Sequence, residues 1–172
     1  MKLKFILHVS LLTVFSVLNA QQNIKPTESI KVFGAVKNSI TFNIDDLDKL
    51  PKTRVKDLVI YNPVGEIKDI LSGMRGVLLK NALSAIQYDY EKPRELNEFY
   101  FVLKASDGYK AVFSWNEIYN TEAGNQYFII TEIQGKTLDQ IPNRIIFLSA
   151  ADLKTGRRYI KGLSEIEVKK AD

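Results

Sequence analysis

The sequence predicts a mixed α/β fold that is rich in strands and carries a few short helices. Residues 99–105 place Phe, Phe, Leu and Ala on one face and Tyr, Val and Lys on the other, which is the period of two of a strand with one face on a core. Residues 127–130 (YFII) are apolar on both faces, as in a strand inside a sheet. No internal repeat or second block of composition divides the 172 residues, so we expect one domain.

The first twenty residues have the layout of a secretory signal peptide. Lys2 and Lys4 precede an apolar run over residues 5–18, and Ala20 is a small residue before two glutamines. Such a run is too short and wrongly flanked for a stable membrane-spanning helix. We therefore expect cleavage after Ala20; the alternative is an uncleaved N-terminal anchor.

Cleavage would leave a flexible lead-in over residues 21–29 and one domain over residues 30–169. The expected location is the periplasm or the cell exterior, with no stable membrane insertion once residues 1–20 are removed. That segment holds two lysines and no acid, so its loss lowers the net charge from +4 to +2. So small a charge gives no argument for binding nucleic acid or anionic lipid.

The sequence contains no cysteine, and its single histidine is His8, in the segment expected to be removed. The mature chain would therefore have no thiolate nucleophile, no imidazole base, and no His or Cys ligand for zinc, copper or haem. Ser-His-Asp and Cys-His catalysis are excluded on this basis. We assign no catalytic residue and no metal ligand.

The first expected strand covers residues 30–36 and is interrupted by Gly34, at a bulge or a close backbone approach. Residues 40–44 alternate again and pair with it across a tight turn. Asp45 or Asp46 then caps a short helix, which a proline ends.

The next segments are a strand, a turn and a helix. Residues 53–61 are expected to form the strand, and Asn62-Pro63-Val64-Gly65 the turn. Residues 66–73 are ambiguous and could form a returning strand. Residues 76–86 carry apolar side chains at helical spacing, which predicts an amphipathic helix over the sheet.

A hairpin feeding a short helix is expected at the centre of the chain. Residues 106–108 (SDG) supply turn residues between residues 99–105 and a second strand at residues 109–113. Ser114 is expected to cap the helix, with Glu117 three residues later in capping-box spacing.

Four further strands are expected in the last third of the chain. Residues 126–133 form the interior strand, and residues 144–148 form another apolar strand after a Pro-Asn pair. A turn at residues 155–156 is followed by strands over residues 157–160 and 163–168.

Four motifs follow one another along this series of elements. They are Gly34-Ala35-Val36 with Ile40-Thr41-Phe42 and Asp46-Leu47…Leu50-Pro51; Gly76-Val77-Leu78-Leu79…Ala82-Leu83; Ala105-Ser106-Asp107-Gly108-Tyr109…Phe113…Glu117-Ile118; and Pro142-Asn143-Arg144-Ile145-Ile146 with the closing Ile166-Glu167-Val168. In this order and spacing, over about residues 30–168, they resemble the oxidoreductase molybdopterin-binding domain of the sulfite oxidase family, in its short exported bacterial form. The resemblance implies a sulfite-oxidase-like fold of mixed sheets with a few short helices.

The sequence departs from that family where the family binds its cofactor. The resemblance implies a molybdenum-ligating cysteine between the third strand and Gly76, but residues 58–75 contain none. Neither Tyr61 nor Asn62 replaces a soft thiolate without changing the electronics of the metal. The histidine donors that family members use to hold the pterin phosphate are also missing. We therefore expect a retained scaffold without a cofactor, and function does not follow from the fold alone.

A first group of candidate ligand-binding residues lies around the central turn. Asp107, Gly108 and Tyr109 form the turn, and Trp115 follows the second strand; together with nearby tyrosines, these aromatic residues either line a pocket or form the edge of the core. Asp107 and Glu117 are either a carboxylate pair for acid–base work or calcium, or a turn residue and a helix cap.

A second group consists of arginines. Together with Lys154 and Lys161, they could present an anion site for a phosphate, sulfate or carboxylate, or could lie on a solvated strand face; the arginines are Arg144, Arg157 and Arg158, each with a fixed fork of donors. Arg75 and Gly76 precede the expected helix, whose N-terminal N–H groups would add to an anion site.

These observations favour an exported, non-catalytic module that binds a small anionic ligand or an exported or membrane protein partner, near the Asp107 turn and Gly76. The alternative that the resemblance implies is a molybdopterin-dependent oxidoreductase that holds its cofactor without a cysteine and passes electrons to a membrane haem protein. A third possibility is a carboxylate-based metal-binding protein.

Overall fold

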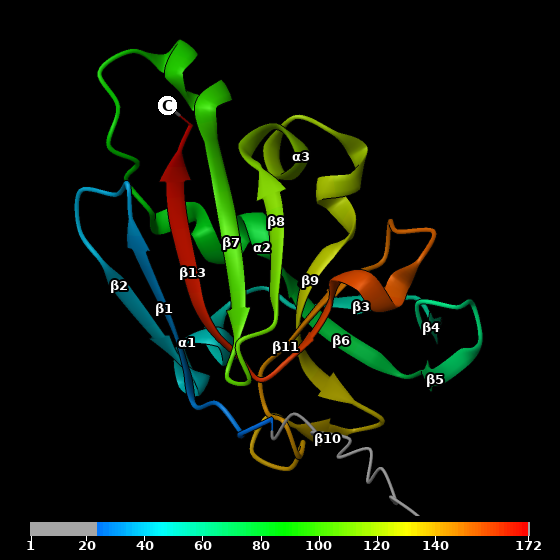
Figure 1. Cartoon of the computed structure of the whole chain (residues 1–172). Coiled ribbons are helices and arrows are strands. Elements are labelled where there is room, and N and C mark those ends of the chain that lie inside the picture. Colours follow the sequence, from blue (N-terminus) through cyan, green and yellow to red (C-terminus); the bar gives the residue numbers. More distant parts are fainter. Residues whose placement is uncertain (1–23, 172) are drawn as a thin grey trace, which may run out of the picture.

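The computed structural model describes residues 24–171. Two sheets lie face to face, and a separate two-stranded hairpin packs against the second sheet (Figure 1). The mixed, strand-rich fold class is therefore confirmed. The expected signal peptide lies outside the described residues. Within them, no helix is long and apolar enough to cross a membrane.

The first sheet has five strands in the order β2-β1-β13-β7-β8, with one parallel pair, β1 and β13. Its strands are β1 (Ser29–Gly34), β2 (Ile40–Asn43), β7 (Phe99–Ala105), β8 (Lys110–Ser114) and β13 (Leu163–Lys170). Strand β7 buries every second side chain, as its alternation predicts. The predicted hairpin of β7 and β8 is also confirmed.

The second sheet is antiparallel, in the order β12-β11-β9-β6-β3, with β10 beside one end of β9. Its strands are β3 (Thr53–Val55), β6 (Met74–Leu78), β9 (Tyr127–Ile133), β10 (Lys136–Thr137), β11 (Ile146–Ser149) and β12 (Tyr159–Lys161). Strand β9 lies between β6 and β11, which confirms its predicted interior position.

The second sheet is buried on both faces. One face meets the first sheet in the main core, and the other packs against the hairpin of β4 (Leu58–Tyr61) and β5 (Ile67–Leu71). In the main core, Phe113 of β8 meets Tyr127 of β9 and Phe147 of β11 edge to face, with ring centroids 5.0 Å and 5.1 Å apart. These aromatic contacts join the two sheets.

The helices are all short and connect strands. They are α1 (Ile44–Lys49), α2 (Leu79–Ala82), α3 (Trp115–Tyr119) and the 3₁₀ turns η1 (Leu83–Ala85), η2 (Pro93–Glu98), η3 (Glu122–Gln126) and η4 (Thr155–Arg158). Helix α3 begins with the predicted capping box: the Glu117 N–H donates to Ser114 Oγ at 3.1 Å, and the Ser114 N–H donates to Glu117 Oε2 at 2.9 Å.

The helix predicted over residues 76–86 begins three residues too early: α2 and η1 together cover residues 79–85. Gly76 and the two residues after it belong to β6, and only residues 79–82 are α-helical. Gly76 suits the strand because a Cβ there would lie 2.8 Å from the Ile129 carbonyl oxygen of β9. Apolar side chains on both faces of an interior strand produce a run that spacing alone does not distinguish from a helix.

Three further boundaries differ from the prediction. The single strand expected at residues 53–61 is divided between β3 and β4, which pair in different sheets. Asn43, rather than Asp45 or Asp46, caps α1, and its Oδ1 accepts from the Asp46 N–H at 2.9 Å. The strand expected at residues 157–160 starts only at Tyr159, because η4 precedes it.

The predicted close approach at Gly34 is confirmed. Its φ is 105°, and a Cβ there would lie 2.1 Å from the Val168 carbonyl oxygen of β13. Glycine therefore permits the parallel pairing of β1 with β13 to end in this conformation.

A tyrosine pair at the edge of the core makes the free energy of unfolding depend on pH in the alkaline range. The hydroxyl oxygens of Tyr88 and Tyr119 are 2.7 Å apart, and burial raises the pKa of both side chains. A raised folded-state pKa contributes stability that is complete below the ordinary tyrosine value of 10.0 and is lost as pH rises above it.

We therefore expect Tyr88→Phe to reduce the loss of stability above this pH. Removing one titrating group should make the slope of unfolding free energy against pH shallower by about 1.4 kcal/mol per pH unit. Urea unfolding across the alkaline range measures this slope, and neutral pH serves as the control, because wild type and variant should have equal slopes there. Equal slopes in the alkaline range would contradict the prediction.

Candidate functional site

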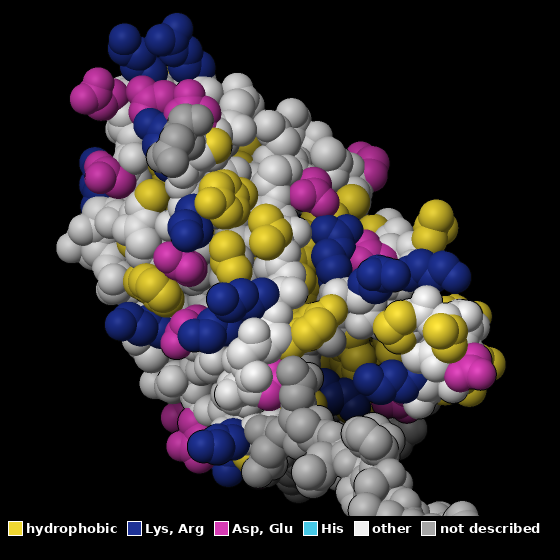
Figure 2. Space-filling view, viewed as in Figure 1, with side chains coloured by type: hydrophobic (Ala, Val, Ile, Leu, Met, Phe, Trp, Pro, Cys, Tyr) yellow, Lys and Arg dark blue, Asp and Glu magenta, His cyan; other side chains and the backbone are white. Residues whose placement is uncertain are grey.

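A pocket of about 410 Å3 opens between three segments that are distant in the sequence. They are the β4–β5 hairpin, the turn between β7 and β8, and η4 with the strand β12 that follows it. We call this cavity the hairpin pocket. Figure 2 shows Lys and Arg side chains gathered around the hollow between the lobe of β4 and β5, on the right, and the main body.

Two contacts hold η4 against β4. The Thr155 Oγ1 hydroxyl donates to the Val59 carbonyl oxygen at 2.7 Å. Gly156 lies so close to β4 that a Cβ on it would be 1.9 Å from the Tyr61 carbonyl oxygen. These contacts place the next residue, Arg157, in the wall of the pocket.

The β7–β8 turn forms the opposite wall. Asp107 Oδ1 accepts from the Tyr109 N–H at 2.9 Å, and Gly108 has a φ of 87°, so the turn forms as the sequence predicts. The Tyr109 hydroxyl donates to the Arg157 carbonyl oxygen at 2.5 Å. Tyr109 therefore ties the turn to η4 across the pocket.

The electrostatics of the hairpin pocket favour an anion. Lys68, Arg157 and Lys161 line it, and Asp107 is the acid among its lining residues. In the described part of the chain, none of these three cations forms an ion pair with a carboxylate. Unpaired cations that converge on a cavity attract negative ligands.

Tyrosine rings supply the apolar walls of the pocket. Tyr61, Tyr109 and Tyr159 line it, and the Lys161 ammonium lies 5.2 Å from the centroid of the Tyr159 ring. Burial, and then the charge of Asp69, raise the pKa of Tyr159.

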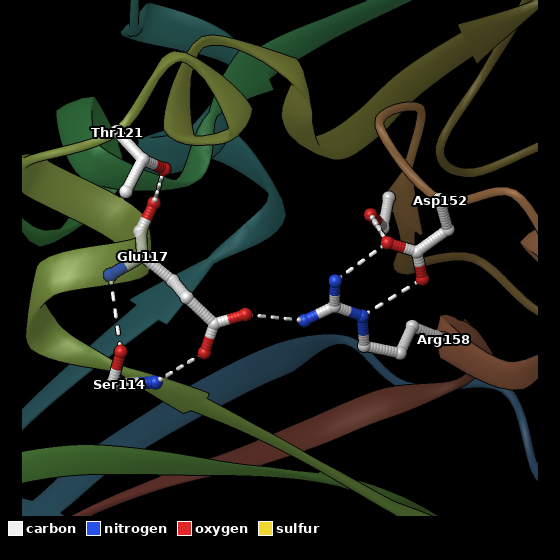
Figure 3. Close-up of polar contacts among 6 residues, drawn as sticks. Ser114, Glu117, Thr121, Asp152 and Arg158 are labelled. Carbon is white, nitrogen blue, oxygen red and sulfur yellow. Dashed lines mark hydrogen bonds and ion pairs between the residues drawn. The ribbon is translucent and has the colours of Figure 1, made fainter.

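Arg158 is not among the residues that line the hairpin pocket, and it points toward Asp152 and Glu117 in a separate cluster (Figure 3). Its Nε donates to Asp152 Oδ2 at 2.8 Å, its Nη2 to Asp152 Oδ1 at 2.5 Å, and its Nη1 to Glu117 Oε1 at 3.0 Å. The guanidinium carbon lies 4.4 Å from the centroid of the Phe113 ring. The hydrogen bonds that Arg158 donates, first to Asp152 and then to Glu117, raise its pKa. We call Arg158, Asp152 and Glu117 the arginine cluster.

The predicted ligand-binding residues are divided among several places. Asp107, Tyr109 and Arg157 line the hairpin pocket, and Gly108 belongs to the same turn. Arg158 belongs to the arginine cluster, so the run of arginines does not act as one group.

The other predicted site residues lie away from the pocket. Trp115 stacks on Tyr119 with ring centroids 5.0 Å apart. The Arg144 Nη1 donates to Glu28 Oε1 at 2.7 Å. Arg75 lies in β6, with its Nε 4.0 Å from Glu132 Oε2. The helix start expected beside Arg75 and Gly76 as part of an anion site is therefore not found there, because both residues lie within strand β6.

The carboxylates of the central turn have local partners. Asp107 closes its own turn, and Glu117 caps α3 and pairs with Arg158. Across residues 24–171, no group of three or more His, Cys, Asp or Glu side chains lies close enough to hold a metal ion.

Sequence reasoning missed Lys68, Tyr61 and Tyr159 as pocket residues. Tyr61 and Lys68 lie in residues 58–75, the interval where the family resemblance places a cysteine. The coincidence of this interval with the implied cofactor site is the signal that could have identified both side chains.

No family model matches the sequence, and no curated protein matches it. Among solved structures, the fold is similar to the crystal structure of the sulfane dehydrogenase SoxCD from Paracoccus pantotrophus, with a TM-score of 0.57 and 11% sequence identity. The match covers 81% of this chain and 37% of that one, so this chain spans little more than a third of its length. At this identity the likeness concerns the fold alone: the chain has a distant sulfite-oxidase-like fold.

Proposed function

We propose that this chain is an exported, non-catalytic protein that binds a small organic anion in the hairpin pocket. The observation that carries the proposal is the convergence of Lys68, Arg157 and Lys161, without carboxylate partners among the described residues, on a cavity walled by tyrosine rings.

The shape and chemistry of the pocket support a compact ligand. A volume of about 410 Å3 lies in the range of small-molecule sites. The Arg157 guanidinium offers a planar fork that matches a carboxylate or phosphate, and the two lysines add point charges. Tyrosine rings offer contact area for a ring-sized body. The proposed ligand therefore carries one strongly anionic group on a flat or apolar body.

The residues at the pocket do not fit the molybdenum cofactor that the fold family implies. The side-chain donors that line it are oxygens and nitrogens of Tyr, Asn, Asp, Lys and Arg, and the sequence offers no cysteine sulfur. A soft thiolate sets both the electronics and the retention of that metal in the family. We therefore derive no redox step and propose that binding takes place without a cofactor.

Calorimetric titration with phenyl phosphate tests the proposal, because this probe joins a dianion to an aromatic ring. We expect wild type to bind it, and Arg157→Gln with Lys161→Gln to weaken binding by at least about 10-fold, the loss typical of hydrogen bonds to charged groups. The matched control is Arg144→Gln with Lys104→Gln, which removes two cations that pair elsewhere with Glu28 and Glu165.

Three results would overturn the proposal. The first is the absence of binding by wild type, and the second is equal binding by the two double variants. The third is molybdenum at near-stoichiometric level in protein purified from an exporting host, which would favour the molybdopterin-dependent oxidoreductase instead.

A further inference from the structure

We infer that Arg158 is a positioning residue for the hairpin pocket: it fixes η4 so that the neighbouring Arg157 stays in the pocket wall. The inference rests on the proposed function, because it assigns a residue outside the pocket to that same site. The two arginines are adjacent in η4 but diverge. Arg157 is exposed and lines the pocket, whereas Arg158 reaches toward α3 (Figure 3).

The Arg158 guanidinium donates hydrogen bonds from all three of its nitrogens, and one of its faces contacts an aromatic ring. Two of its nitrogens engage both oxygens of Asp152, a third engages Glu117, and its plane lies against the Phe113 ring. A bidentate arginine–carboxylate pair fixes orientation as well as distance. The guanidinium therefore has one well-defined place.

Both carboxylates of the arginine cluster are themselves anchored. The Ser149 hydroxyl, at the end of β11, donates to Asp152 Oδ1 at 2.6 Å. The Ser114 N–H, at the start of α3, donates to Glu117 Oε2 at 2.9 Å. Arg158 thus links η4 to two elements that belong to the folded core.

The η4 turn needs such support because it has little structure of its own. It spans four residues, and the described backbone bond that closes it is from the Arg157 N–H to the Lys154 carbonyl oxygen, at 3.0 Å. On the pocket side it is held by the Thr155 and Tyr109 hydroxyls. Arg158 supplies the contacts on the opposite side, so η4 is clamped between the hairpin and the core.

This clamp affects affinity through pre-organisation. An arginine on a loose turn must give up backbone and side-chain freedom when it binds an anion, and that cost is subtracted from the binding free energy. With η4 fixed in advance, Arg157 gives up only the freedom of its exposed side chain when it meets the ligand.

The direction in which one substitution changes the affinity for an anion separates a positioning role from a purely electrostatic one. Asp152→Asn removes a negative charge that is paired with Arg158 of η4, so the change in charge alone should tighten anion binding. Positioning predicts the opposite, because the bidentate pair is broken: phenyl phosphate should bind about 5-fold more weakly. The control, Asp45→Asn, makes the same charge change at an exposed site on α1 and should not weaken binding.

A double-mutant cycle shows whether the effect passes through Arg157. In an Arg157→Gln background, Asp152→Asn should change the affinity for phenyl phosphate by less than about twofold, since the positioned group is already gone. General damage to the pocket would persist in that background. Arg158→Lys, which keeps the charge but loses the fork, should reproduce the pattern and replaces Asp152→Asn if circular dichroism shows that variant to be unfolded.

The outcomes distinguish a failure of the proposed function from a failure of the positioning role of Arg158. If wild type does not bind phenyl phosphate, the proposed function fails; hydrogen exchange of the η4 amides then tests the clamp directly, and faster exchange in Asp152→Asn or Arg158→Lys is expected. If wild type binds, either of two results would show that the positioning role is wrong. In the first, both folded variants bind phenyl phosphate as tightly as wild type. In the second, each variant loses as much affinity in the Arg157→Gln background as it does in the wild-type background. Unchanged η4 exchange would overturn it too.

Discussion

Replacing Gly156 by alanine is expected to lower the free energy of unfolding by about 3 kcal/mol or more, because the new methyl group meets backbone rather than a flexible side chain. Its Cβ would lie 1.9 Å from the Tyr61 carbonyl oxygen and 3.1 Å from the Tyr61 carbonyl carbon. The η4 turn must then move away from β4, and the hydrogen bond from Thr155 to Val59 is lost with that movement. Urea unfolding monitored by circular dichroism measures the change.

Gly108→Ala provides the matched control. Gly108 also lies in a loop at the hairpin pocket, but among residues 24–171, apart from its two chain neighbours, no atom lies within 4 Å of the position that its Cβ would take. Its φ of 87° remains strained for alanine, so we expect a cost of about 1 to 2 kcal/mol from the backbone alone. If Gly156→Ala costs no more than Gly108→Ala, η4 and β4 are not in close contact.

The parts of the fold that local signals determine were predictable from the sequence. The alternation of residues 99–105, the turn chemistry of Asp107 and Gly108, and the Ser114–Glu117 capping box each involve residues within a few positions of one another. The structure confirms all three. These features need no knowledge of what lies across the sheet.

The parts that depend on distant partners were not predictable in this way. Residues 76–78 form a strand because β9 lies beside them, some fifty positions later in the chain. Residues 53–61 are divided because β3 pairs with β6 while β4 pairs with β5. Spacing along the chain carries no information about either pairing.

The same distinction applies to the hairpin pocket. Asp107, Tyr109 and Arg157 could be chosen from the sequence as polar or aromatic residues near turns, but their convergence with Lys68 depends on how the β4–β5 hairpin lies against η4. Arg158 could not be separated from Arg157 by sequence, because only the position of Glu117 and Asp152 in space sets the two arginines apart.

Phe113→Ala is expected to destabilise the fold by about 3 to 5 kcal/mol, the cost of removing a fully buried aromatic side chain and leaving a cavity. Phe113 is 0% exposed and joins the two sheets through Tyr127 and Phe147. Its neighbour Val112 points out of the same strand and is 55% exposed, so Val112→Ala should cost less than about 1 kcal/mol. Urea unfolding of the two variants compares one strand's inner and outer faces. Because the Phe113 ring also lies under Arg158, its loss should loosen η4 and weaken phenyl phosphate binding as well, whereas Val112→Ala should change neither property. Similar losses of stability in the two variants would show that Phe113 does not fill the space between the sheets.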